Sequence, residues 1–193
     1  MDSKLYRFLR PIIKFLTNTF IRPKYIGIEN IPKEGRIILA GRHTSILDCF
    51  LLISATKRSV HFLAKKELWK GLKKILFANM GLIPVDRSKK SHNSLVKAEE
   101  YLKNECLIGI FPEGTINRGK DITLPFKIGS VKMAHDTNSY LVPFVITGKY
   151  KLFGGVRIEF LKPYKVGDNL TEENNKLRNI IEKRLEAGNG NFK

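Results

Sequence analysis

Short apolar segments alternate with helical segments along most of the chain, and this alternation restricts the possible folds more than any other feature. Segments 36–40, 107–111 and 140–147 are rich in aliphatic and aromatic residues and have polar or turn-forming neighbours, a pattern typical of buried strands. Helical segments such as 45–56 and 125–136 separate them. Alternating strands and helices are characteristic of α/β proteins. Because the sequence contains neither a repeat nor a linker, we expect a single α/β domain with a mostly parallel or mixed sheet flanked by helices.

The remaining elements are predicted by the same criteria. Further strands are expected at 24–31, 60–64 and 156–160, and further helices at 66–80, 91–104 and 171–187. Pro143 interrupts an otherwise strand-like segment and has no N–H to donate to a ladder. Its presence predicts that this strand is at an edge of the sheet, or that the strand ends there.

The first helix has an unusual composition. Residues 4–20 carry apolar side chains at helical spacing and basic side chains on another face, and Pro11 either kinks the helix or starts its second half. Such a helix either lies in a membrane interface or packs against its own domain, and the net charge of +17 favours the membrane. We therefore divide the chain into an N-terminal amphipathic membrane-interface helix, residues 1–22, and a main domain, residues 23–193.

The excess of positive charge also narrows the range of partners. Nucleic acid, an anionic membrane and a phosphorylated substrate all suit a chain with 35 basic and 18 acidic residues. The lysines are interleaved with apolar residues and no nucleic-acid-binding motif is present, so we expect no nucleic-acid partner. Cys49 and Cys106 are interpreted as buried free thiols of a reducing compartment. Neither a metal-ligating cluster, nor a signal peptide, nor a transmembrane run of about 18 uncharged residues is evident.

His43 directly follows the predicted strand at 36–40, and Asp48 lies five residues further on. Positions five apart on a helix diverge by about 140°, so the two side chains meet only if His43 precedes the helix and turns back over it. Thr44 and Ser45 are good N-cap residues, which predicts that the helix begins there. The pair is interpreted either as a general base with its orienting acid or as a simple polar pair at a helix start.

Two further polar loops also follow apolar strands, at Asp86-Arg87 and at Glu113. In α/β sheets, ligands bind beyond the carboxyl ends of the strands. Gly114 allows a backbone turn that other residues resist. Together with His43, these loops predict one site that contains a base, carboxylates and cations.

Four motifs in this order resemble those of the glycerolipid acyltransferase family, whose best-known members are 1-acylglycerol-3-phosphate acyltransferases. The motif N-H-x4-D is matched at His43 and Asp48, with Arg42 where Asn is usual. The motif G-x-I-P-V-x-R is matched at 81–87, and an apolar V-P pair is matched at 142–143. The resemblance spans about residues 24–165, and it identifies 23–193 as an acyltransferase domain.

The motif F-P-E-G-T-R-S-R is matched only in part. Residues 111–115 and Arg118 agree with it, but Ile116 and Asn117 replace the Arg-Ser pair. Ile116 thus removes one arginine that the family offers for phosphate recognition. Arg42 either compensates for the missing arginine or is a solvated charge.

The resemblance implies transfer of a fatty acyl group from acyl-CoA or acyl-acyl carrier protein to the sn-2 hydroxyl of 1-acylglycerol 3-phosphate, giving phosphatidic acid for phospholipid biosynthesis. His43 would be the general base and Asp48 would fix its tautomer. No further cofactor is expected, and no serine nucleophile is needed because the acceptor hydroxyl attacks the thioester directly. The protein is expected to be peripheral, on the cytoplasmic face of an anionic cell membrane.

The resemblance also implies a set of substrate-binding residues. They are Lys65, Arg87, Glu113, Gly114, Thr115 and Arg118. Arg118 and Lys65 are the first candidates for the acceptor phosphate, and Arg87 is the next. Glu113 would bind the glycerol or hold one of these cations.

Other functions remain open. The acceptor could be another lysolipid or glycerol 3-phosphate, or the chain could be a non-catalytic basic module that binds membranes. Trp69, which lies among lysines, is a second candidate for a membrane contact. His61, His92 and His135 are interpreted as structural or surface residues.

Overall fold

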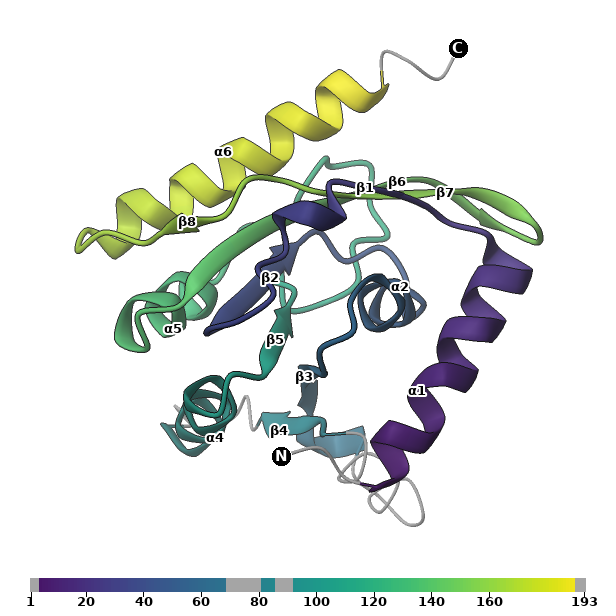
Figure 1. Cartoon of the computed structure of the whole chain (residues 1–193). Coiled ribbons are helices and arrows are strands. Elements are labelled where there is room, and N and C mark those ends of the chain that lie inside the picture. Colours follow the sequence, from purple (N-terminus) through teal and green to yellow (C-terminus); the bar gives the residue numbers. More distant parts are fainter. Residues whose placement is uncertain (1–3, 69–80, 86–91, 190–193) are drawn as a thin grey trace.

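The computed structural model describes residues 4–68, 81–85 and 92–189. Within these residues eight strands form one sheet in the order β1-β7-β6-β2-β5-β3-β4, and β8 pairs with β6 (Figure 1). The strands are β1 (Lys24–Ile26), β2 (Ile37–Gly41), β3 (Val60–Lys65), β4 (Ile83–Val85), β5 (Leu107–Ile110), β6 (Tyr140–Lys151), β7 (Gly154–Phe160) and β8 (Tyr164–Lys165). Only the pairs β6–β7 and β6–β8 are antiparallel among those described. The sheet is therefore mixed and mainly parallel, as predicted.

Helices cover both faces of the sheet (Figure 1). They are α1 (Lys4–Leu16), α2 (Asp48–Ala55), α4 (His92–Lys103), α5 (Gly129–Asp136) and α6 (Leu170–Asn189), with short turns η1 (Thr17–Ile21), η2 (Ile28–Asn30) and η3 (Lys66–Leu68). One apolar cluster joins the sheet to α1 and α2, and a second joins its other face to α4, α5 and α6. Strand β2 supplies both clusters, Ile37 and Leu39 to the first and Ile38 and Ala40 to the second. This two-sided burial explains why its sequence is continuously apolar.

Several boundaries differ from the predicted ones. The strand expected at 24–31 ends at Ile26, because Gly27 adopts a positive φ of 67° and η2 follows. The helix expected from residue 45 begins at Asp48, because the Asp48 carboxylate accepts hydrogen bonds from the N–H groups of Thr44 and Ser45 and so holds the residues before it in a loop. The helix expected at 125–136 begins at Gly129. Of the helix expected at 66–80, only η3 lies within the described residues.

Pro143 does not mark an edge or a strand end. It lies inside β6, opposite Ala40 of β2, in the middle of the sheet. Its carbonyl accepts a hydrogen bond from the N–H of Leu161, in the connection between β7 and β8. A residue's N–H and C=O point to the same side of a strand, so the missing N–H of Pro143 also faces that connection. The β2–β6 ladder therefore loses no hydrogen bond.

Helix α1 both packs and exposes apolar surface. Tyr6 is buried, and its hydroxyl accepts a hydrogen bond of 2.9 Å from the N–H of Val60. Ile13 packs against the first apolar cluster, and Pro11 lies inside the helix without ending it. The opposite face carries Phe8 and Phe15, each 66% exposed. In the described part of the chain, every helix is too short or too polar to cross a bilayer.

Candidate active site

The predicted polar loops leave the sheet at one edge. Strands β2, β5, β3 and β4 are parallel, with Ala40 beside Ile110 and Lys65 beside Val85. The carboxyl ends of these strands therefore lie together, and the loops that carry His43 and Glu113 start there. Asp86 and Arg87, which follow β4, lie outside the described residues.

The side chains of His43 and Asp48 are in contact, and His43 precedes helix α2, as their spacing of five residues requires. The His43 Nδ1 atom lies 2.9 Å from Oδ2 of Asp48, which is fully buried, while the His43 side chain is 14% exposed. An ionised carboxylate only accepts hydrogen bonds, so Nδ1 carries the proton and Nε2 of neutral His43 has a free lone pair. Asp48 is the first residue of α2, where the helix dipole favours a negative charge. The pair is suited to take a proton from a hydroxyl group.

Four further donors surround the Asp48 carboxylate. Oδ2 accepts hydrogen bonds from the N–H groups of Thr44 (2.6 Å) and Ser45 (2.9 Å). Oδ1 accepts from the hydroxyls of Thr44 (3.1 Å) and Tyr150 (2.5 Å). Burying a carboxylate is costly unless donors replace the lost water. These contacts replace that water and hold the Asp48 carboxylate in one orientation.

The His43 ring and backbone are also fixed. The ring stacks on Phe111 with centroids 3.9 Å apart and planes 15° apart. The His43 N–H donates to Oε2 of Glu113 (3.2 Å), and its carbonyl accepts from the N–H of Asn117 (2.8 Å). The loop after β5 thus holds the base from two sides.

The buried Glu113 side chain connects two loops by hydrogen bonds. Besides its contact with His43, its Oε1 accepts hydrogen bonds from the N–H of Leu124 (2.9 Å) and the amide of Asn117 (3.4 Å). These contacts join the loop after β2 to both ends of the 113–124 segment. A role of Glu113 in binding glycerol stays a prediction.

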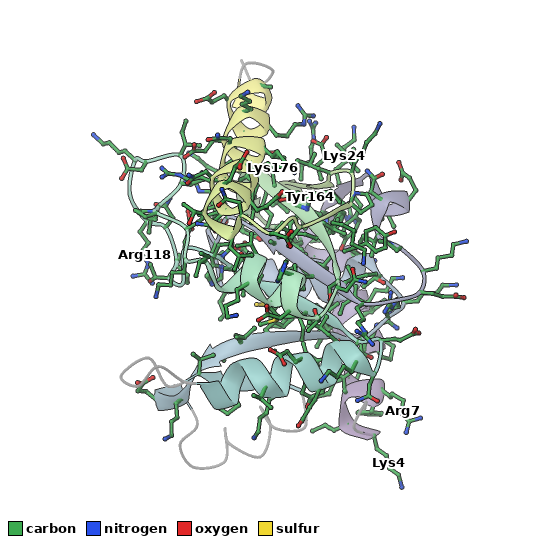
Figure 2. The ribbon with its side chains drawn as sticks, turned by 90° about the vertical axis from the view of Figure 1, so that its left-hand side faces the viewer. Lys4, Arg7, Lys24, Arg118, Tyr164 and Lys176 are labelled. Atoms are coloured by element: carbon green, nitrogen blue, oxygen red, sulfur yellow. The ribbon has the colours of Figure 1, made fainter. Side chains whose placement is uncertain are left out.

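The other predicted substrate-binding residues are less closely grouped. Gly114 has a φ of +68°, and a Cβ there would lie 2.9 Å from Nζ of Lys127, so this glycine makes room for a lysine side chain. Thr115 is exposed. Figure 2 shows the Arg118 side chain projecting outward from the loop. Lys65 ends β3 at the same edge of the sheet. Their roles, and that of Arg87, stay predictions.

Sequence reasoning missed two of these contributors. Lys127 lies nine residues after Arg118, the last residue of the third motif, and has no local signal beyond its charge. Tyr150 is 102 residues from Asp48, and nothing in its sequence surroundings indicates the contact.

The other predicted histidines that can be described are structural or on the surface. His61 is buried, with Nδ1 3.1 Å from the carbonyl of Gly81, and His135 is exposed between Asp136 and Asp168. Cys49 and Cys106 are free thiols, and burial, with the Asp48 charge, raises the pKa of Cys49 to about 12. The described residues contain no metal-ligating group of three or more side chains.

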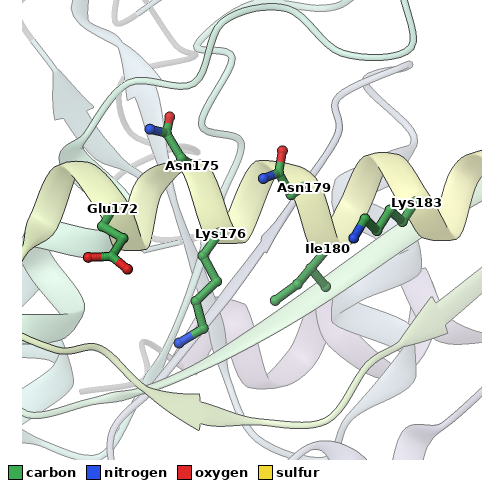
Figure 3. A pocket seen from close by; sticks show the side chains of 6 residues that line it. All are labelled: Glu172, Asn175, Lys176, Asn179, Ile180 and Lys183. Atoms are coloured by element: carbon green, nitrogen blue, oxygen red, sulfur yellow. The ribbon is translucent and has the colours of Figure 1, made fainter.

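The shallow hollow in Figure 3 lies elsewhere. It is formed along α6 by Glu172, Asn175, Lys176, Asn179, Ile180 and Lys183. Helix α6 belongs to the second apolar cluster, on the opposite face of the sheet from α2. None of the predicted site residues lines this hollow, so it is not the site at His43.

Comparison with known proteins identifies relatives over most of the chain. A family model described as Acyltransferase matches residues 22–147. The 1-acyl-sn-glycerol-3-phosphate acyltransferase of Borreliella burgdorferi is 36% identical over 130 residues, which are 66% of this chain and 52% of that protein. The protein of the same name from Bacillus subtilis is 30% identical over 151 residues, 75% of this chain and 72% of that protein. The protein of the same name from Saccharomyces cerevisiae is 33% identical over 168 residues, which are 78% of this chain and 54% of that protein. The chain thus spans about half the length of the Borreliella and yeast proteins.

A solved structure has the same fold. The crystal structure of the 1-acyl-sn-glycerophosphate (LPA) acyltransferase PlsC from Thermotoga maritima matches with a TM-score of 0.79 at 24% identity, covering 98% of this chain and 83% of that one. This likeness confirms the predicted α/β architecture with its N-terminal helix.

Proposed function

This chain belongs to the acyltransferase family, and from that premise we propose that it transfers a fatty acyl group to the sn-2 hydroxyl of 1-acylglycerol 3-phosphate, giving phosphatidic acid. The acyl donor is acyl-CoA or acyl-acyl carrier protein. The relatives, which are 1-acyl-sn-glycerol-3-phosphate acyltransferases, support this acceptor. The observation that carries the proposal is the pairing of His43 with a buried Asp48 at the carboxyl edge of the sheet.

The chemistry follows from that pair. Nε2 of His43 takes the proton of the acceptor hydroxyl as its oxygen attacks the thioester carbonyl carbon. The C–S bond then breaks, and the imidazolium gives its proton to the leaving thiolate. The products are an ester and a free thiol, and His43 is neutral again. Asp48 holds Nδ1–H and stabilises the imidazolium between the two transfers. No covalent acyl-enzyme is required.

The acceptor phosphate requires cations near this edge. Arg118 and Lys65 are the first candidates and Arg87 the next, because guanidinium and ammonium groups form charge-assisted hydrogen bonds with phosphate. Lys127, whose side chain lies over Gly114, adds a cation that the motif itself does not contain. It lies in the same loop system as Ile116, where the family motif has arginine.

The exposed face of α1 supports a peripheral position on the cytoplasmic face of an anionic membrane. Phe8 and Phe15 on α1 are each 66% exposed, and the β6–β7 hairpin adds Leu152 (68%) and Phe153 (54%). The N–H of Phe153 donates to the carbonyl of Phe20, so hairpin and helix form one apolar surface. Figure 2 shows Lys4 and Arg7 projecting from the same helix. Basic residues beside such a surface attract anionic lipid.

The test is an acyl-transfer assay with purified protein, labelled acyl-CoA and a panel of acceptors. We expect labelled phosphatidic acid with wild type and none with His43→Ala, at unchanged circular dichroism. Transfer only to another lysolipid or to glycerol 3-phosphate would replace the acceptor but keep the chemistry. Vesicle binding without any transfer, using either donor, would instead identify a non-catalytic membrane module.

A further inference from the structure

Among the described residues, Tyr150 makes the one hydrogen bond to the Asp48 carboxylate that comes from outside the loop before α2. We propose that Tyr150 is a positioning residue of the transfer reaction, which fixes the Asp48 carboxylate and, through it, the orientation and proton affinity of His43. The inference rests on the proposed function, because it assigns Tyr150 a part in the same base. None of the four sequence motifs contains this residue.

The geometry is that of an ordered hydrogen bond. The Tyr150 hydroxyl donates to Oδ1 of Asp48 at 2.5 Å, while His43 occupies Oδ2. Tyr150 lies near the end of β6, within the stretch between Gly148 and Lys151 where the pairing with β7 shifts register. Its ring packs against the apolar cluster that contains α2. The phenol is thus held by the sheet, whereas the other donors to Asp48 belong to residues 43–45, just before α2 in the chain.

The surroundings of Tyr150 keep its hydroxyl protonated, so that it can donate a hydrogen bond. Burial, together with the neighbouring Asp48 charge, raises the pKa of Tyr150 far above its usual value, so its hydroxyl keeps its proton. Burial likewise raises the pKa values of Cys49, which neighbours the Asp48 carboxylate, and of Tyr25, which neighbours Tyr150, to about 12, so both stay neutral. Glu113 approaches His43 from the other side, where it binds the backbone N–H.

A donor on Oδ1 has a definite electrostatic effect. It disperses the negative charge of Asp48, which weakens the attraction between the carboxylate and the imidazolium of His43. Removing the phenol hydroxyl therefore strengthens that attraction and favours protonated His43. It also removes the hydrogen bond that ties Asp48 to β6. A Tyr150 that served packing alone would have neither effect.

The test is Tyr150→Phe, which keeps the ring and removes the hydroxyl. The matched control is Tyr164→Phe, because the Tyr164 hydroxyl is buried without a hydrogen-bond partner among the described residues and its ring lies under Lys176 (Figure 2). We expect Tyr150→Phe to raise the midpoint of the His43 titration, followed by NMR, by about half a unit to one unit. The acid limb of the pH–kcat profile should move by the same amount, so kcat measured on that limb should fall about 3- to 10-fold at unchanged KM for both substrates. Tyr164→Phe should change none of these.

A double-mutant cycle separates positioning from packing. In an Asp48→Asn background the Tyr150→Phe change should have less effect on kcat than in wild type, because the carboxylate that it acts through is gone. Equal effects in both backgrounds, or an unmoved His43 titration, would overturn the inference. The NMR titration needs no turnover. If wild type transferred no acyl group, the proposed function would fail, while the shift of the His43 midpoint would still decide whether Tyr150 controls this imidazole.

Discussion

Replacing Asp48 with asparagine tests how the carboxylate acts on His43. Oδ2 faces three N–H donors, from His43, Thr44 and Ser45, whereas Oδ1 faces the hydroxyls of Thr44 and Tyr150. An asparagine amide fits in one orientation only: its oxygen takes the Oδ2 position, and its NH2 group donates to the two hydroxyls, which can also accept. The variant should therefore keep Nδ1 protonated. What it loses is the charge that stabilises the imidazolium.

The size of the loss follows from the geometry. An ion pair about 4 Å between charges, at an effective dielectric constant of about 20, interacts by about 4 kcal/mol, and part of this is recovered by the neutral hydrogen bond that remains. A net loss of about 2–4 kcal/mol lowers kcat about 30- to 1,000-fold, at 1.36 kcal/mol per factor of ten. A variant that selected the wrong tautomer would lose more, of the order of 10⁴.

The assay measures kcat for wild type, Asp48→Asn and His43→Ala, with 15N NMR to assign the His43 tautomer and thermal melts to confirm folding. A rate for Asp48→Asn between those of the other two, with Nδ1 still protonated, is the expected result. A wild-type rate would refute the charge argument. A rate equal to that of His43→Ala, with Nε2 protonated, would refute the donor arrangement around Asp48.

Three further predictions concern the phosphate, the membrane and one surface histidine. Arg118→Ala should raise the acceptor KM by about one to two powers of ten and leave the donor KM unchanged, since a charge-assisted hydrogen bond contributes about 1.5–3 kcal/mol; an effect at Arg42→Asn instead would place the phosphate by the first motif. Phe15→Ser should weaken sedimentation with anionic vesicles, whereas Val96→Ser, an exposed apolar position on α4, should not; equal binding by both would place the membrane contact elsewhere. Hydrogen bonds to Asp136 and then Asp168 raise the pKa of His135, so its contribution to stability is full below the unfolded pKa and is lost as the pH rises through the folded one. The Tm difference between wild type and His135→Gln should thus be larger at about pH 5 than at about pH 9, and a pH-independent difference would contradict the assignment.

The membrane contact is tested by single substitutions, because α1 is also packed against the domain. Deleting residues 1–20 would remove Tyr6, which is buried and hydrogen-bonded to Val60, together with the contact of Ile13 with the first apolar cluster. Such a deletion is expected to destabilise the domain, so loss of vesicle binding would have two causes. Single substitutions at the exposed positions leave the packed face intact.

The parts of the site that are local in sequence could be predicted from sequence. The strand before His43 is recognisable because burial on both faces requires a continuous apolar run. His43 and Asp48 are five residues apart, so the geometry of one turn is enough to bring them together. The convergence of the loops at His43 and Glu113 follows from a general rule of parallel sheets. The boundaries of α2 and β1 were less accurate, because the hydrogen bonds of the Asp48 carboxylate to the N–H groups of Thr44 and Ser45 and the positive φ of Gly27 override local propensity.

The sequence by itself determined the α/β class, the order of the motifs and the pairing of His43 with Asp48, since periodicity, turn chemistry and short-range spacing are properties of neighbouring residues. The tertiary structure alone decided that Pro143 lies inside the sheet, that α1 buries Tyr6 while it exposes Phe15, and that Tyr150 completes the shell of donors around Asp48. Each of these depends on which strand lies beside which, and a contact across 102 residues leaves no trace in the periodicity of either segment.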